Sequence, residues 1–427
     1  MMKHKITAVL SVFCLLAAGC SSAAPEASAS SAASSSTAAV GDSEQKMVLS
    51  GITFPTGDLG AKIQIQDPKE LTEEETAEAE RASRAYVPGP ESFLKNKAKD
   101  YYYYSQLDAE AKGIYDALYM VADDPVSPDN IVIYSTDLDP KSDEFMLEMY
   151  RAYYGMLYDH PELFWLYNDT LASIGYDIPR FNSQQGKNDV YFRMITPYND
   201  FEKDMTKFNE AADQFLADID LTGSDEQIAR AIHDKLINTV RYDLEVMEKN
   251  LGEDLAHTAY GALVGNSRGE ANTAVCDGYS LAYEYLLQQA GMEVSVLIGI
   301  AGNDEETAGG HAWSIAKING EWKEIDSTWD DMGTLEEELE AYKGDMVYDY
   351  YKEALNDEAY RDSIEHYLFG ISTSAMKNYD PGNNYVYDSK DGLYEYSLVG
   401  PSVHLRASEI TGWEPYDQVV SMAPTAN

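Results

Sequence analysis

Cysteine is nearly absent from this sequence, with three in 427 residues. Cys14 lies inside an apolar N-terminal leader and Cys20 stands directly after it, so export would leave Cys276 as the one thiol not otherwise used. A solitary thiol cannot form an internal disulfide. Cys276 is therefore either a small buried apolar side chain or a reactive group.

Positive charge is also scarce. The chain has 31 Lys and Arg against 74 Asp and Glu, a formal charge of −43. Removal of residues 1–19, which contain two lysines and no acids, leaves 29 against 74, or −45. A protein this acidic repels phosphate backbones, so we exclude nucleic acid as a partner. The simplest interpretation is a solvated, self-repelling surface.

Metal-binding patterns are missing as well. The seven histidines are scattered, and no His-x-x-x-His or Cys-x-x-Cys pair is present. Asp137, Asp139 and Asp143 do not form an EF-hand loop, because Lys141 occupies the third ligand position and no glycine follows it. We expect neither a metal site nor a cofactor.

The chain begins with a signal-like leader. Two lysines precede a 13-residue apolar run over residues 6–18, too short to span a membrane and typical of a secretory signal. Small residues precede Cys20, and this ending resembles the bacterial lipoprotein cleavage box, in which the cysteine becomes the lipidated first residue. An ordinary signal peptide cleaved near Ala24 is the alternative. Residues 20–46 predict a disordered, Ser- and Ala-rich tether, which would hold the protein on the extracytoplasmic face of the cell membrane.

The remaining chain divides into three regions. Residues 47–222 predict a mixed α/β region, with a helix over residues 142–158 and a strand over residues 189–195. Residues 223–345 carry the motifs described below. We expect residues 346–427 to be a C-terminal extension that packs on this core.

A helix is predicted to begin at Cys276 or just after it. Apolar residues recur there at i, i+3, i+4, i+7 and i+8, and Gly291 caps the end: Tyr279, Ala282, Tyr283, Leu286 and Leu287. In the first turn, the amide N–H groups and the helix dipole favour thiolate over thiol by about 0.3–1 kcal/mol. This is too little for activation, so a neighbouring imidazolium must supply most of it.

A hairpin can supply that imidazole. Asn319-Gly320 is a strong signal for a two-residue turn between strands over residues 311–318 and 321–328. In this register the numbers of paired residues sum to 639, so His311 opposes Thr328, and Trp313 opposes Asp326.

His311 and Asp326 are then diagonal neighbours on one face of the sheet, about 7–8 Å apart at the backbone. An imidazole and a carboxylate can meet across this distance. The order Cys276, His311, Asp326 suggests a nucleophile, a base and an orienting carboxylate.

At these residues the chain resembles the transglutaminase-like superfamily. The resemblance covers about residues 223–335 and rests on four short segments: Val275-Cys276-Asp277-Gly278-Tyr279, the Leu-Leu-x-x-Ala-Gly end of the helix, His311-Ala312-Trp313, and Trp322-x-x-Ile-Asp326-x-Thr-Trp329-Asp330. It implies an α+β fold with a papain-like core, in which a cysteine at a helix N-terminus packs on an antiparallel sheet. It also implies Cys276 as nucleophile, His311 as general base and acid, and Asp326 as its orienting partner.

The chain departs from the family pattern at the oxyanion site. The Gly-Gln-Cys-Trp of the animal enzymes is absent, and the loop over residues 265–274 is longer than in close bacterial relatives. We expect the backbone N–H of Cys276 to be one donor and offer Tyr260 as the second. Trp313 and Trp329 are expected in the core or in the wall of the substrate cleft.

These features predict an exported, tethered cysteine enzyme that forms a thioester from a peptide or protein amide. Water at the thioester would make it a protease or deamidase, and an amine would make it a cross-linking acyl transferase. The expected substrate lies outside the membrane, with cell-wall peptide as one candidate, and we expect a monomer. The alternatives are an inactive transglutaminase-like binding module and a surface adhesin or substrate-binding lipoprotein whose function resides in residues 47–222.

Overall fold

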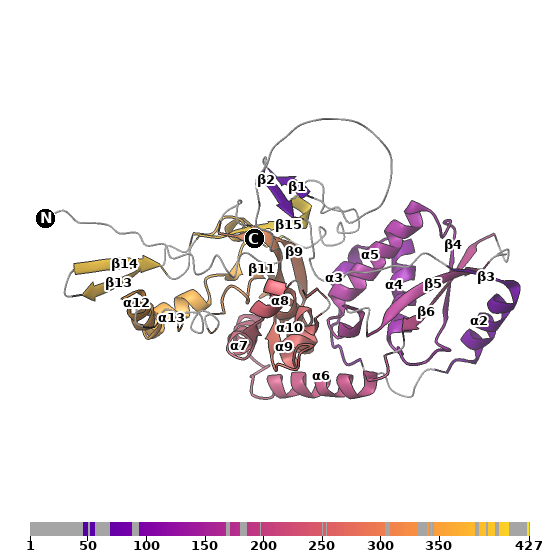
Figure 1. The fold of residues 1–427 in the computed structure, drawn as a ribbon, viewed down its shortest axis with the longest axis horizontal. Coiled ribbons are helices and arrows are strands. Elements are labelled where there is room, and N and C mark those ends of the chain that lie inside the picture. The colour runs from indigo at the N-terminus through magenta and orange to yellow at the C-terminus, as the bar shows by residue number, and fades with distance from the viewer. Residues whose placement is uncertain are drawn as a thin grey trace.

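A five-stranded antiparallel sheet forms the centre of the protein (Figure 1). Its strands follow the order β12-β11-β10-β9-β15, and β9 (Val294–Gly302), β10 (Gly309–Ile318) and β11 (Glu321–Ile325) are consecutive in the chain. The outer strands β12 (Phe369–Ile371) and β15 (Val403–Arg406) both come from the C-terminal extension. The C-terminal extension therefore supplies both edge strands of the sheet.

The protein is described here by a computed structural model. It covers residues 46–49, 52–55, 69–87, 94–167, 171–179, 186–196, 198–249, 251–252, 254–303, 308–331, 333, 340, 343, 346–380, 384–389, 392–397, 401–409 and 425–426. The predicted leader, the lipidation site Cys20 and the tether as far as residue 45 lie outside the described residues.

Helix α10 (Cys276–Gln289) packs against β9 and β10 and has Cys276 as its first residue. Its residues are buried from Cys276 to Gln288, so it is a central helix rather than a surface one. Gly291, with φ of 79°, ends it as predicted: the Gly291 N–H donates to the Gln288 carbonyl at 2.9 Å, and the next N–H reaches Leu287 at 3.0 Å. The predicted α+β class, with a cysteine at a helix N-terminus on an antiparallel sheet, is confirmed.

The β10–β11 hairpin has the predicted register but is shorter than predicted. Ser314 pairs with Ile325 and Ile318 with Glu321, as the predicted sum of 639 requires. Asn319 and Gly320 both have positive φ, 53° and 85°, as a type I′ turn demands.

The predicted pairs beyond Ile325 do not form. Asp326 accepts the N–H groups of Thr328 and Trp329 on Oδ1, at 3.0 and 3.2 Å, and this starts a turn. The chain therefore leaves the sheet three residues earlier than the alternating pattern predicts, so His311 does not pair with Thr328, nor Trp313 with Asp326.

A second sheet lies in the N-terminal lobe, the part of the chain from β3 to β6 (residues 69–196; Figure 1). Its order is β3-β5-β6-β4, from β3 (Lys69–Leu71), β4 (Val132–Thr136), β5 (Ser173–Pro179) and β6 (Asn188–Thr196). Within this sheet β3 and β5 pair in parallel, and the β5–β6 and β6–β4 pairs are antiparallel. The strand predicted over residues 189–195 is β6.

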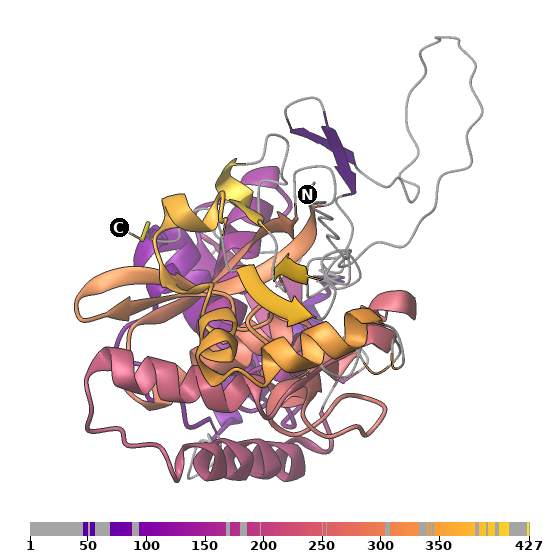
Figure 2. The same cartoon turned by 90° about the vertical axis from the view of Figure 1, so that its left-hand side faces the viewer.

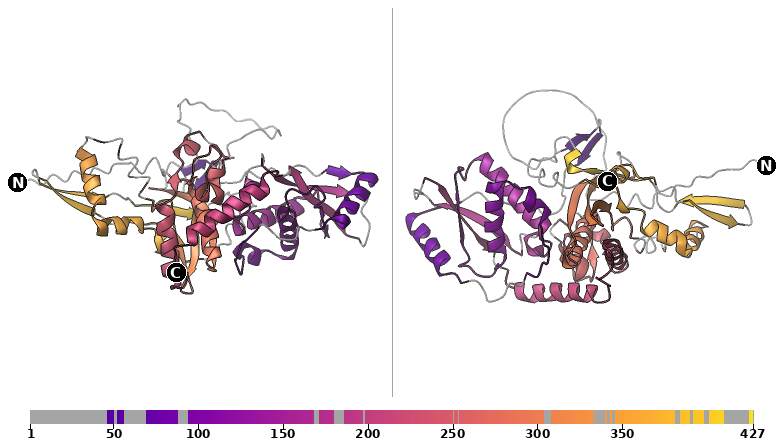
Figure 3. Two further views of the ribbon diagram at one scale, coloured as in Figure 1. Left: turned by 90° about the horizontal axis from the view of Figure 1, so that it is seen from below. Right: turned by 180° about the vertical axis from the view of Figure 1, so that it is seen from behind.

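Helices enclose the sheet of the N-terminal lobe. Helices α4 (Ala109–Ala122) and α5 (Asp143–Asp159) lie between it and the core lobe, and α2 (Glu73–Ala85) lies on the far side (Figure 1). The helix predicted over residues 142–158 is α5, which Ser142 caps by accepting the Phe145 N–H. Helix α6 (Phe201–Leu216) runs along the base of both lobes (Figure 3).

Buried polar contacts join the two lobes. The Tyr103 hydroxyl, on α3 (Tyr102–Gln106), donates to the Val296 carbonyl of β9. Gln288 of α10 donates to the Asp159 carbonyl at 3.1 Å. The N-terminal lobe thus contacts both the sheet and the helix that carry the candidate site.

The remaining helices and strands can be followed from a second side in Figure 2. They are β1 (Lys46–Leu49), β2 (Ile52–Pro55), η1 (Phe164–Tyr167), α7 (Asp225–Ile237), β7 (Arg241–Tyr242), α8 (Leu244–Lys249), η2 (Leu255–His257), α9 (Ala259–Leu263), β8 (Thr273–Ala274), α12 (Met346–Leu355), α13 (Glu358–Glu365), α14 (Thr373–Met376), β13 (Asn384–Ser389), β14 (Gly392–Ser397) and η4 (Ala407–Glu409). Among the described residues, no helix has both the length and the apolar character needed to cross a bilayer.

Candidate active site

Cys276 occupies the first turn of α10, where unpaired amide groups and the helix dipole favour a negative charge. The segment η2 packs against this turn, and the Val275 N–H donates to the Ala256 carbonyl at 3.0 Å. Gly278 makes the approach possible, because a Cβ there would lie 2.3 Å from the Ala256 oxygen. Glycine in the Cys-Asp-Gly segment is therefore a packing requirement of the helix start.

His311 and Asp326 are in direct contact. The His311 ring is hydrogen-bonded to Asp326 Oδ2 through Nε2, at 2.7 Å, and the Cys276 thiol interacts with the same ring. Burial works against a charged imidazole, but the Asp326 carboxylate and the contact with Cys276 outweigh it and raise the pKa of His311 to about 10. The arrangement can hold an imidazolium beside a thiolate at neutral pH.

Asp326 is buried and accepts hydrogen bonds on both oxygens. Burial disfavours its ionised form, but the charge of His311 and the hydrogen bonds from two imidazoles hold the pKa of Asp326 well below its usual range. The same turn that ends β11 aims the carboxylate at His311, since Oδ1 accepts the N–H groups of Thr328 and Trp329. The structure thus brings Cys276, His311 and Asp326 together.

The second imidazole on Asp326 is that of His404, which sequence reasoning missed. His404 lies on β15 and contacts Asp326 Oδ2 through Nε2 at 2.9 Å. It is fully buried between the rings of Trp313 and Trp329, with ring centroids 5.3 and 5.2 Å away. No local pattern could have revealed it, because 78 residues separate it from Asp326.

A second imidazole also lies close to the thiol. His257, in η2, donates from Nδ1 to the carboxylate of Asp277, the residue after Cys276, at 2.8 Å from Oδ2. Burial opposes its charge, but Asp277, with a smaller contribution from Cys276, raises the pKa of His257 to about 9. Sequence reasoning passed over His257, although its place two residues before the α9 helix and near the loop to Cys276 was a usable signal.

The two predicted cleft tryptophans are buried. Trp313 and Trp329 expose 1% and 3% of their surfaces and pack around His311, with ring centroids 6.0 and 6.1 Å from it. Trp313 donates from Nε1 to Glu324 at 2.7 Å. The sequence placed these rings in the core or in the wall of the substrate cleft. Both lie in the core, where they form an apolar wall around the imidazoles.

Tyr260 does not take the predicted place as an oxyanion donor. Its hydroxyl donates to Asp204 of α6 at 3.3 Å, and its ring packs on Phe164 and Phe208. The helix that carries Tyr260, α9, faces α6, and this contact directs the side chain into the interface between those helices. The prediction for Tyr260 is therefore corrected.

The thiol is covered. Cys276 exposes 4% of its surface, His311 6% and Asp326 none. A covered site strengthens the electrostatic interactions among its charged groups. It also means that only an extended chain or a small reagent could reach the thiol.

Two groups of described side chains bring three potential metal ligands within 4.8 Å of one another. One is His311, Asp326 and His404, and the other is His233, Asp234 and His366. In both groups imidazole nitrogens are hydrogen-bonded to the carboxylate, at 2.7 and 2.9 Å in the first and at 3.3 and 2.6 Å in the second. A cation would have to displace the protons in these bonds, which argues against a metal at either group. The absence of a metal site stays a prediction.

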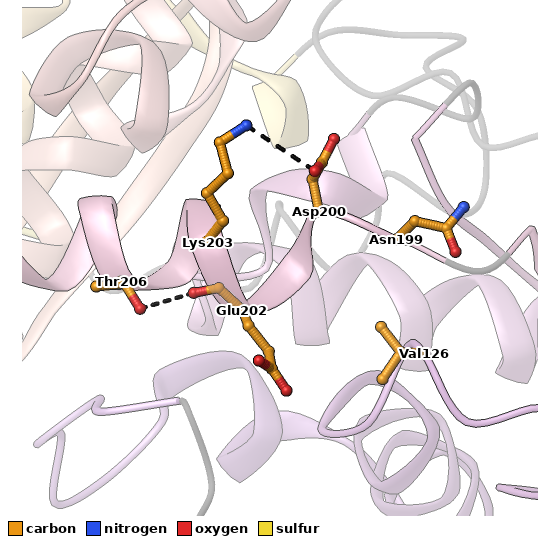
Figure 4. A pocket seen from close by; sticks show the side chains of 6 residues that line it. All are labelled: Val126, Asn199, Asp200, Glu202, Lys203 and Thr206. Atoms are coloured by element: carbon orange, nitrogen blue, oxygen red, sulfur yellow. Dashed lines mark hydrogen bonds and ion pairs between the residues drawn. The ribbon is translucent and has the colours of Figure 1, made fainter.

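A surface hollow lies away from these residues, at the start of α6 (Figure 4). It is lined by Val126, Asn199, Asp200, Glu202, Lys203 and Thr206. Lys203 forms a long ion pair with Asp200 at 3.9 Å, and the Thr206 hydroxyl donates to the Glu202 carbonyl at 2.7 Å. The hollow holds none of the predicted site residues, and its mixed charges favour no ligand class.

No protein-family model and no curated protein matches the chain. Among solved structures, a transglutaminase aligns with 38% of this chain and 45% of its own, at 15% identity and a TM-score of 0.24. A candidate cysteine protease from Cytophaga hutchinsonii aligns with 37% of this chain and 64% of its own, at 14% identity and a TM-score of 0.22. The aligned parts are thus less than two thirds of either protein. Because such scores do not establish a shared fold, the chemistry of the site rests on its own residues.

Proposed function

We propose that this chain is a transglutaminase-like cysteine enzyme that forms a thioester from a peptide or protein amide. The observation that carries the proposal is the contact between His311 and Asp326 at 2.7 Å, with the Cys276 thiol, at a helix N-terminus, interacting with the same imidazole. These are the geometric relations of a nucleophile, a base and the group that orients the base.

The proposed reaction has two steps. The Cys276 thiolate attacks the amide carbon, and the His311 imidazolium gives its proton to the departing amine, which leaves a thioester and a neutral imidazole. His311 then takes a proton from water or from an amine as that molecule attacks the thioester. The products are an acid or a new amide, and the thiolate and the imidazolium are regenerated. The backbone N–H of Cys276 is the proposed donor to the oxyanion.

Alkylation of Cys276 tests the activated thiol. We would react the full-length protein with iodoacetamide between pH 4 and 9.5 and follow Cys276 by peptide mass spectrometry, which separates it from Cys14 and Cys20. An ordinary thiol, with a pKa of about 8.5, loses roughly two orders of magnitude in rate between pH 9 and 6. We expect a loss of less than tenfold here, because the imidazolium sustains the thiolate.

The variants His311→Gln and His160→Gln form a matched pair. Both remove a buried imidazole bonded to a carboxylate, since His160 Nδ1 lies 2.8 Å from Glu162 in the other lobe. We expect only His311→Gln to restore the pH profile of an ordinary thiol. If the wild type already has that profile and His311→Gln leaves it unchanged, the enzyme proposal fails, and the binding module or adhesin stands in its place.

Three activity assays then distinguish the fates of the thioester. Incorporation of a fluorescent amine into a glutamine-containing protein reports transamidation, ammonia release from glutaminyl peptides reports deamidation, and fragment formation reports proteolysis. All three activities should be lost in Cys276→Ser. A protein that is inactive in every assay but has a reactive Cys276 would point to a narrower substrate, such as cell-wall peptide.

We also propose that the protein is tethered through Cys20 to the extracytoplasmic face of the cell membrane. The support is the leader and the small residues before Cys20. Metabolic labelling with a fatty acid should mark the wild type and not Cys20→Ser, and only the wild type should sediment with membranes. Cleavage beyond Cys20 without lipid would show an ordinary secreted protein.

A further inference from the structure

We propose that His404 is a positioning residue of this active site and that the C-terminal extension completes the site by supplying it. The inference rests on the proposed function and adds a second imidazole to the Cys276, His311 and Asp326 arrangement. His404 contacts the carboxylate of Asp326. It acts through the carboxylate that orients His311.

The geometry places both imidazoles on one oxygen. His311 Nε2 and His404 Nε2 lie 2.7 and 2.9 Å from Asp326 Oδ2, and the two ring centroids are 5.6 Å apart. An ionised carboxylate can only accept, so each Nε2 donates a hydrogen. With Oδ1 taken by the N–H groups of the following turn, Asp326 is held by four donors and has one orientation.

The two imidazoles differ in charge. Burial lowers the pKa of His404 against the opposing effect of Asp326, whereas the pKa of His311 is raised. In the described part of the chain, His404 Nδ1 has no hydrogen-bond partner, so a proton there would be buried and unpaired. His404 is therefore a neutral donor that holds the carboxylate without competing with the charge on His311.

Packing leaves the His404 ring little freedom. Trp313 and Trp329 enclose it with edge-on contacts. Its strand is held on β9, where His404 pairs with Ala301, and Gly299 allows the approach because a Cβ there would lie 2.0 Å from the Leu405 oxygen. The ring is fixed by the extension and not by the hairpin that carries His311 and Asp326.

Several other titratable groups face this cluster. Cys276 of α10 interacts with His311, and Asp330 belongs to the turn after Asp326. Glu324 of β11 lies near His404 and is ion-paired with Arg406 of β15. Any pH profile of the site reflects these groups too, so the test compares variants of His404 that leave them in place.

Two substitutions separate donation from packing. His404→Phe keeps a ring of similar size and removes the donor, and His404→Gln keeps an N–H donor and loses ring volume. For the iodoacetamide reaction of Cys276 at pH 6 in the full-length protein, we expect about a tenfold slower rate in His404→Phe. This variant loses one hydrogen bond to a charged group, and such a bond changes an equilibrium by about tenfold or more. His404→Gln should stay within about threefold of the wild type, and His160→Gln is the control.

The opposite order would overturn the inference. If His404 only fills space, His404→Phe keeps the wild-type rate and His404→Gln is the slower variant. If instead the cluster holds a metal, the wild type carries stoichiometric metal by elemental analysis, and a chelator changes its rate at pH 6.

A readout on His311 separates this inference from the proposed function. In protein labelled with 15N-histidine, the Nε2 proton of His311 should exchange faster with water in His404→Phe than in the wild type and His404→Gln. If Cys276 proves unreactive while this difference is present, the enzyme proposal fails and the positioning role stands. If Cys276 is reactive and the three proteins show the same exchange, the positioning role fails alone.

Discussion

Asp277 Oδ2 accepts a hydrogen bond from His257 Nδ1 at 2.8 Å, so the residue next to the candidate nucleophile holds a second imidazole beside it. The pair is buried, and the raised pKa of His257 makes it a cation at neutral pH. Cys276 therefore interacts with two imidazoles, each hydrogen-bonded to its own carboxylate. His311 is hydrogen-bonded to the thiol, whereas His257 acts on it through its charge.

Replacement of His257 should weaken the reactivity of Cys276 without abolishing it. We expect His257→Gln to slow alkylation at pH 6 by roughly twofold to tenfold, because it removes a nearby positive charge but leaves the hydrogen bond to His311. The rate at pH 9 should change little. A loss as large as that of His311→Gln would show that His257 is the proton-transfer group instead.

Asp326→Asn should separate geometry from charge. The amide can still accept a hydrogen bond from His311, but it cannot stabilise an imidazolium, and the equivalent change in a serine protease triad lowers kcat by about 10⁴. We expect a loss of about 10³–10⁴ in any thioester-dependent activity. Asp177→Asn, in the other lobe, is the control, since it removes a buried carboxylate paired with Arg193. An active Asp326→Asn would assign the orienting role elsewhere.

Stability should decline as the solution becomes alkaline. His311 and His257 have folded pKa values of about 10 and 9, above the usual 6.5. Their stabilising contribution is therefore fully present below about pH 6.5 and is lost as the pH rises through 9 and 10. Thermal unfolding between pH 6 and 10.5 should show a falling Tm, and a double His311→Gln, His257→Gln variant should show a flatter profile. Equal slopes in the two proteins would contradict the assignment.

Glu284 offers a stabilising substitution. It is buried on α10 with one carboxyl oxygen unpaired in the described part of the chain, and burial raises its pKa well above the usual value. The folded protein therefore holds a proton on this carboxyl to higher pH than the unfolded chain does, which costs stability as the pH rises above the unfolded pKa. Glu284→Gln removes this cost, so we expect a higher Tm at pH 7.5 and no gain at pH 4. Glu245→Gln, at a half-exposed carboxylate, should have no such effect.

Gly278→Ala should disturb the start of α10. Its Cβ would meet the Ala256 carbonyl at 2.3 Å, and the displaced segment carries His257. We expect destabilisation of about 1–3 kcal/mol, as in other overpacked sites, together with slower alkylation of Cys276. Gly252→Ala, where nothing lies within 4 Å, should leave both properties unchanged. If Cys276 were alkylated at the wild-type rate in Gly278→Ala, the segment that carries His257 would be free to move away.

Local patterns were sufficient for the hairpin and the helix of the site. The Asn319-Gly320 turn specified the register from Ser314 to Ile325, and apolar spacing with Gly291 specified α10. The contact between His311 and Asp326 follows from that register, even though β11 ends before Asp326. The end of the strand was missed because a carboxylate that caps a turn looks, in an alternating pattern, like one more strand residue.

Long-range placement was beyond local patterns. His404 reaches Asp326 only because β15 pairs with β9, and no periodicity in residues 346–427 specifies that edge. The error for Tyr260 has the same origin. The sequence offered Tyr260 as a donor without any long-range information, whereas the packing of α9 on α6 directs its hydroxyl to Asp204.

The order of the sheet also has a consequence in time. Ribosomes make Cys276, His311 and Asp326 well before residues 403–406, which close the edge of β9 and bring His404. A nascent chain that ends before β15 already has its thiol and its base but lacks the strand that locks the carboxylate. The folding of the C-terminal extension, about the last fifth of the polypeptide, is thus the step that would add the positioning imidazole, so truncated products of synthesis or proteolysis should react more slowly at Cys276.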